Sequence, residues 1–107
     1  MVRPLMHEDL FLAIAHPIRR SVLEELRIRE TPSTQLAARF GVAPSLLSQH
    51  LKVLKDTGLV TEHRAGRQRI YSLCPEPLQE VSDWIESFSD FWPRKMAALG
   101  KHLRRSK

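Results

Sequence analysis

The sequence has little cysteine, few glycines and no long apolar run, and each shortage excludes a class of protein. Cys74 is the only cysteine in 107 residues, so an intrachain disulfide framework is excluded. A chain without disulfides is typical of a reducing compartment, and we expect a cytoplasmic protein. A lone cysteine such as Cys74 is more often a small apolar side chain buried in the fold. An oxidation switch through a sulfenate or an intersubunit bond is the alternative.

The apolar segments are too short for a membrane or an export signal. Near the N-terminus, Leu10 to Ala15 forms the apolar run, and Glu8 and Asp9 precede it, which does not fit a signal peptide. No stretch approaches the roughly 18 apolar residues that a membrane span requires. We therefore expect no membrane partner.

Catalytic and metal-binding patterns are also scarce. Ser48 and His50 are two residues apart, so on a helix they diverge by about 200° and cannot share a proton. No Gly-rich phosphate loop or convergent carboxylate pair is present. A transition-metal site needs several converging imidazole or thiolate ligands, whereas the histidines are scattered. We predict that the chain is not an enzyme and needs no cofactor or metal; a cluster of His7 and His102 across two subunits, with carboxylates, is the alternative.

Positive charge is in excess and concentrated in the middle of the chain. Seventeen Lys and Arg stand against twelve Asp and Glu, which gives a net charge of +5. Residues 41–73 hold five of the basic side chains and only two acidic ones. This balance favours a polyanionic partner, with the central block as its contact surface.

Apolar residues at helical spacing predict a single domain over 1–107 that is mainly α-helical. The spacing predicts a first helix over 5–15 and a second that opens at Pro17. A third begins with Thr31 as its N-cap and ends at Gly41, which can take a positive φ. Pro44 then opens a fourth helix.

The pattern changes period after the fourth helix. Residues 59–73 alternate as in a two-stranded β-hairpin, and from 76 to 105 the spacing again predicts one long amphipathic helix, interrupted by Pro93. A helix-turn-helix over 31–56 followed by a basic hairpin is the layout of a winged helix-turn-helix protein.

The orientation of the fourth helix follows from its apolar residues. With Leu47 at the centre of the buried face, Ser45, Gln49 and Lys52 lie on the opposite side. Serine and glutamine suit base edges in a major groove, and lysine suits phosphate or guanine. An ordinary solvated helix face is the alternative reading. At the hairpin tip, Arg64 and Arg67 can reach the DNA backbone or minor groove.

Three segments resemble the ArsR/SmtB family of bacterial transcriptional repressors. They are "LAIAHPIRRSVLEEL", "STQLAARFGVAPSLLSQHLKVLKDTGLV" and "RAGRQRIYSL", in that order. The resemblance implies a homodimer that represses from a palindromic DNA operator, usually until an inducer binds. It also implies which residues face DNA or brace that face: Ser45, Ser48, Gln49, His50 and Lys52, with Arg64, Arg67 and Arg69 in the wing. Ala43 departs from the family pattern, in which a serine commonly caps this helix.

Aromatic residues gather in the C-terminal segment, and we expect them to form a dimer interface with the first helix. A pocket for a small organic inducer of unknown chemistry is the alternative. The residues predicted at the dimer interface are Leu10, Phe11, Ile14, Trp84, Ile85, Phe88, Trp92, Met96 and Leu99. The main prediction is a homodimeric repressor that binds double-stranded DNA. A protein–protein interaction module and a metal- or thiol-responsive repressor are the alternatives.

Overall fold

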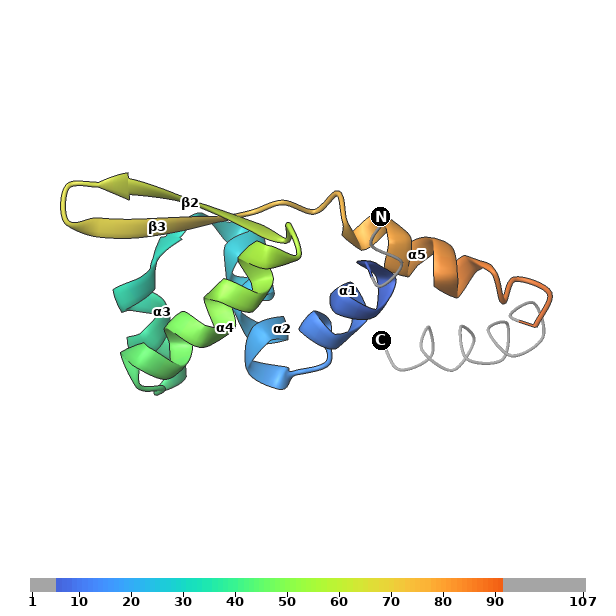
Figure 1. Ribbon diagram of the computed structural model, residues 1–107, viewed down its shortest axis with the longest axis horizontal. Coiled ribbons are helices and arrows are strands. Elements are labelled where there is room, and N and C mark those ends of the chain that lie inside the picture. Colours follow the sequence, from blue (N-terminus) through green and yellow to red (C-terminus); the bar gives the residue numbers. More distant parts are fainter. Residues whose placement is uncertain (1–5, 92–107) are drawn as a thin grey trace, which may run out of the picture.

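The computed structural model describes residues 6–91, which form five helices and one small antiparallel sheet (Figure 1). The helices are α1 (Met6–Ile14), α2 (Pro17–Ile28), α3 (Ser33–Phe40), α4 (Pro44–Asp56) and α5 (Leu78–Glu86). The strands are β1 (Thr31–Pro32), β2 (Val60–Ala65) and β3 (Gln68–Leu73). This arrangement confirms the predicted fold class. None of the helices described is long and apolar enough to cross a membrane.

The core lies where α2, α3 and α4 meet the base of the sheet. The predicted stripe of α4 is buried there: Leu47, Leu51 and Leu54 are almost fully covered. Leu36 of α3 and Leu59, just before β2, join them. Each buried leucine contributes about 2 kcal/mol through the hydrophobic effect, so these side chains fix α4 against the rest of the domain.

The α3–α4 turn forms as its glycine and proline predict. Gly41 follows α3 with φ 64°, and the Val42 N–H donates to the Ala37 carbonyl at 3.2 Å. Pro44 then occupies the first turn of α4, where a missing N–H costs nothing. The cap position before it is Ala43, which makes no side-chain hydrogen bond. The loop between the two helices is therefore short, and their relative orientation is set by the core.

Two arginines join α1 to α2. Arg19 donates through Nε to the Ala13 carbonyl at 2.8 Å, and Arg20 donates to the Ile14 carbonyl, also at 2.8 Å. The last carbonyls of a helix have no partner within the helix and carry partial negative charge. The first turn of α2 thus supplies the cations that the end of α1 lacks.

Thr31 belongs to the sheet, so its prediction as a helix N-cap is wrong. It pairs with Tyr71 in β3, and its hydroxyl donates to the Arg29 carbonyl at 3.0 Å. Pro32 precedes α3 without a side-chain cap, and a proline favours extended backbone in the residue before it. The sheet therefore has three strands in the order β1-β3-β2, not the two expected of a simple hairpin.

The predicted long C-terminal helix is shorter than expected, because α5 ends at Glu86 and turns follow as far as Phe91. The Ser87 hydroxyl donates to the Trp84 carbonyl. Such local side-chain bonds compete with helix continuation, and the sequence that follows, Ser-Phe-Ser-Asp, offers little helix propensity. Pro93, Trp92, Met96 and Leu99 lie outside the described residues.

Candidate nucleic-acid interface

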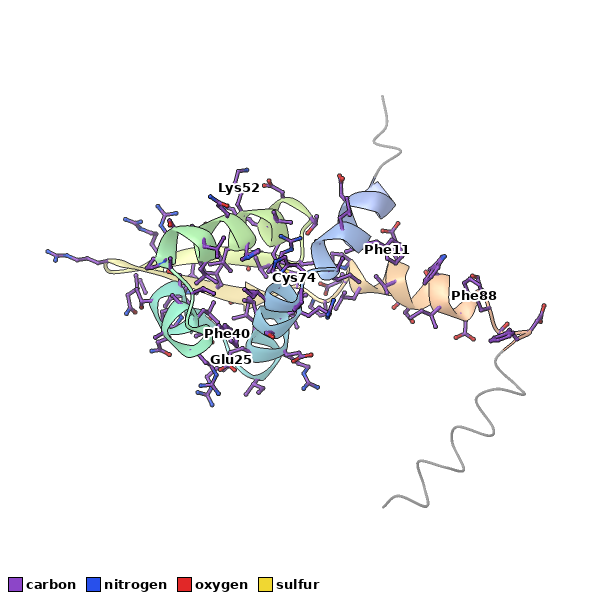
Figure 2. The ribbon with its side chains drawn as sticks, turned by 90° about the horizontal axis from the view of Figure 1, so that it is seen from below. Phe11, Glu25, Phe40, Lys52, Cys74 and Phe88 are labelled. Carbon is purple, nitrogen blue, oxygen red and sulfur yellow. The ribbon has the colours of Figure 1, made fainter. Side chains whose placement is uncertain are left out.

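A stripe of exposed polar side chains runs along α4 on the side away from the core. Ser45, Ser48, Gln49 and Lys52 are all exposed, at the spacing that puts side chains on one helix face. Lys52 points away from the body of the molecule (Figure 2). Its ammonium donates to Asp56 at 2.9 Å, but both side chains are solvated. An exposed pair of this kind contributes little, so Lys52 is available to another anion.

His50 is different, because its side chain faces into the molecule. It is 7% exposed, and its ring centroid lies 4.4 Å from that of His16. The Nη1 of Arg19 is 3.2 Å from its Nδ1. Of the two roles that the resemblance implies, these contacts favour bracing, because His50 links α4 to α2.

The wing is the part of β2 and β3 that extends beyond the core. Gly66 and Arg67 form its two-residue turn, with Gly66 at φ 65°, the positive angle that such a turn demands. Arg64 lies directly opposite Arg69 in the strand register, and both are exposed, as is Arg67. Like charges in such a pair repel each other, and an anion close by, such as the Glu62 carboxylate that Arg69 contacts, offsets this repulsion.

One carboxylate between the wing and α4 was not predicted from the sequence. Glu62 of β2 accepts from Lys55 Nζ and from Arg69 Nη1, both at 2.8 Å. The hydrogen bond from Lys55 lowers the pKa of Glu62, and burial opposes it; the same bond raises the pKa of Lys55. The lining of the adjoining pocket, of about 320 Å³, comprises Ser33, Ser48, Lys52, Lys55, Asp56, Glu62, Arg69 and Tyr71.

Helix α5 lies at the other end of the molecule from the wing (Figure 1), and it exposes large apolar side chains. Trp84 and Ile85 of α5 are 55% and 46% exposed, and no α5 side chain is buried. Trp84 packs edge-on against Phe11 of α1, with ring centroids 5.4 Å apart, and Figure 2 shows Phe11 where the two helices meet. Phe88 packs against Trp84 in the same way at 5.2 Å.

The other residues predicted at a dimer interface fall in different places. Ile14 is half-buried and packs against the core. Leu10 is 2% exposed and belongs to the core of its own chain, and its place at an interface stays a prediction.

Metal and thiol chemistry receive no support from the described part of the chain. There, no three histidine, cysteine or acidic side chains lie together as potential metal ligands. The side chains of His7 and His102 lie outside the described part, so the predicted absence of a metal remains a prediction. Cys74 is half-buried after β3, and its backbone N–H donates to the Leu59 carbonyl at 2.8 Å.

A polar recognition helix set on a three-helix core beside a basic hairpin defines a winged helix-turn-helix DNA-binding regulator. The profile of the bacterial regulatory protein, arsR family, matches residues 16–62. The chain is 31% identical to the transcriptional repressor SdpR of Bacillus subtilis, over 75% of this chain and 89% of that protein. The chain belongs to the ArsR family of transcriptional regulators.

Solved structures agree with this assignment. The ArsR family transcriptional regulator RHA00566 superimposes with a TM-score of 0.76 at 30% identity, covering 85% of this chain and 94% of that one. The homodimeric winged helix-turn-helix DNA-binding domain Mb0332 of Mycobacterium bovis shares the fold, with a TM-score of 0.65 at 24% identity and 79% of each chain covered.

Proposed function

We propose that the protein is a homodimeric repressor that binds a palindromic DNA operator. The observation that carries the proposal is the exposed polar stripe of α4 beside a wing with exposed arginines. In a two-fold dimer, the two α4 helices enter successive major grooves about 34 Å apart. A two-fold protein matches a two-fold operator, because each subunit then meets the same bases.

Base contacts and phosphate contacts come from different side chains in this complex. Ser45, Ser48 and Gln49 have the hydrogen-bonding groups that contact base edges. Lys52 at the end of the stripe, and Arg64 and Arg67 on the wing, bind phosphates and position the helix in the groove. A backbone role for the wing arginines makes affinity fall steeply as salt rises, because each neutralised phosphate releases counterions.

The second subunit covers the apolar surface made by α1 and α5. Several large apolar side chains exposed together on one face mark a surface that a partner covers, and Trp84, Ile85 and Phe88 are 55%, 46% and 43% exposed. The similar domain Mb0332 is described as homodimeric, which supports the same assembly here. Phe11, packed edge-on against Trp84, then lies at the edge of the interface.

Repression, rather than activation, is proposed because the related SdpR is named a transcriptional repressor. The regulator acts in the cytoplasm, where bacterial DNA is found, and it performs no catalysis.

Selection of duplexes from a random DNA pool at near-physiological salt tests the proposal, with and without a reductant and a chelator. We expect an enriched inverted repeat that neither additive abolishes. Weak, salt-insensitive binding without enrichment would instead favour the protein-interaction module. Loss of enrichment under one additive would point to a metal- or thiol-responsive repressor.

A further inference from the structure

We infer that Glu62 is a positioning residue, which holds the wing at a fixed angle to the recognition helix by joining Lys55 of α4 to Arg69 of β3. The inference rests on the proposed function. It adds Glu62, a carboxylate, to the residues that tight DNA binding requires. No DNA contact is assigned to Glu62 itself.

Glu62 lies where the sheet leaves the core. On the same face of β2, Val60 is buried and Arg64 is exposed, so Glu62 stands between the anchored and the free part of the strand. Beyond it, the remaining residues of β2 are all exposed. A contact at Glu62 therefore fixes the direction in which the exposed end of the hairpin extends from the core.

The geometry of the two ion pairs joins separate elements. Lys55 reaches Glu62 Oε1 from the last turn of α4, and Arg69 reaches Oε2 from the neighbouring strand. Each carboxylate oxygen thus has its own cation, and the Glu62 side chain is only 11% exposed. The two cations are more than half exposed, at 54% for Lys55 and 56% for Arg69, so only the carboxylate is sheltered. What distinguishes this site from a single surface pair is that one carboxylate accepts charge-assisted bonds from two elements.

The Lys52–Asp56 pair provides a built-in comparison. It lines the same pocket, and it also joins a cation to a carboxylate. However, both partners belong to α4, and the Asp56 side chain is 61% exposed. Asp56 therefore resembles Glu62 in charge and location, but it connects no second element.

This difference yields opposite expectations for two substitutions. Removing a negative charge from a DNA-binding face strengthens attraction to phosphates, if charge alone matters. Asp56→Asn should follow that rule and bind duplex DNA as tightly as the unsubstituted chain, or more tightly. Glu62→Gln should do the reverse and weaken binding about tenfold, because the wing cations no longer reach their phosphates together.

The test has two measurements on the full chain. The first is the dissociation constant for the selected operator across a series of salt concentrations. Glu62→Gln should also reduce the slope of log affinity against log salt by about one for each phosphate that the wing no longer neutralises. The second is the set of residual dipolar couplings of β2 and β3 amides relative to α4, measured by NMR without DNA. We expect these couplings to change in Glu62→Gln and to stay the same in Asp56→Asn.

The outcomes separate the inference from the proposed function. Unchanged couplings in Glu62→Gln, or binding as tight as that of Asp56→Asn, would overturn the inference. If the unsubstituted chain bound no duplex, the proposed function would fall, while the couplings would still decide whether Glu62 orients the wing. Should Glu62→Gln fail to fold, Glu62→Asp keeps the charge but shortens the reach, and it should shift the couplings and weaken binding in the same direction.

Discussion

At the residue scale, the proton on His50 follows from the partner of its ring. Arg19 is only a donor, so the Nδ1 that lies 3.2 Å from its guanidinium must accept, and the hydrogen of the ring sits on Nε2. His50 in this arrangement is neutral. Burial, followed by the neighbouring His16 and Arg19, lowers the pKa of His50 below its ordinary value of 6.5.

We predict that this arrangement destabilises the fold at acidic pH. The unfolded chain binds the proton more readily than the folded chain does, so the free energy of unfolding falls as pH drops below 6.5 and through the lowered pKa. Above 6.5 the contribution is constant. His50→Asn offers an oxygen to Arg19 without a titratable ring, so its stability should fall less steeply over the same range. Urea unfolding between about pH 8 and pH 5, above the range of most carboxylates, measures both curves. Parallel curves would contradict the prediction.

At the element scale, local signals were sufficient for α3, α4 and the turn between them. Gly41 and Pro44 mark the turn by backbone preferences that depend on a single residue, and the leucines of α4 show its buried face through their spacing. The wing was equally visible, because alternation and the Gly66 turn are local. Those features place α3, α4 and the hairpin without knowledge of the tertiary structure.

Tertiary contacts were not predictable in the same way. Thr31 joins the sheet because Tyr71, forty residues later, offers a partner strand. The contact of Arg19 with His50 spans 31 residues. Glu62 is seven residues from each of its two cations, but Lys55 lies in a helix, Glu62 in a strand and Arg69 in the next strand, so no single repeat brings the three together. Helical geometry predicted that the His50 side chain lies beside the core. Its burial depends on contacts with Arg19 and His16, which the sequence does not reveal.

The apolar face of α5 has a measurable consequence. Ile85→Asp places a charge in the proposed subunit interface, where it cannot keep its hydration, so we expect mainly monomers by sedimentation velocity at micromolar concentration. Ile28→Asp, a change of the same chemistry on the exposed last turn of α2, is the control and should remain dimeric. A dimer that persists in Ile85→Asp would place the interface elsewhere.

At the scale of the whole molecule, the two ends serve different purposes. The tip of the β2–β3 hairpin and α5 lie at opposite ends of the ribbon, and α4 lies on the same side of α1 as the hairpin (Figure 1). His50, with Arg19 and His16, lies on the path between them: Arg19 holds both the end of α1 and the ring of His50. The surface proposed to bind a second subunit is therefore connected by hydrogen bonds to the helix proposed to read DNA.

The central claim is that α4 reads sequence and the wing contacts the backbone. The measurement that tests it most directly compares Gln49→Ala with Arg67→Ala on the selected operator and on an unrelated duplex. Gln49→Ala should lose about 1–3 kcal/mol on the operator and little on the unrelated duplex, because it removes a base contact. Arg67→Ala should weaken both duplexes similarly and lower the salt dependence, because it removes a phosphate contact. If Arg67→Ala changed the sequence preference and Gln49→Ala did not, the assigned roles would be reversed and the account contradicted.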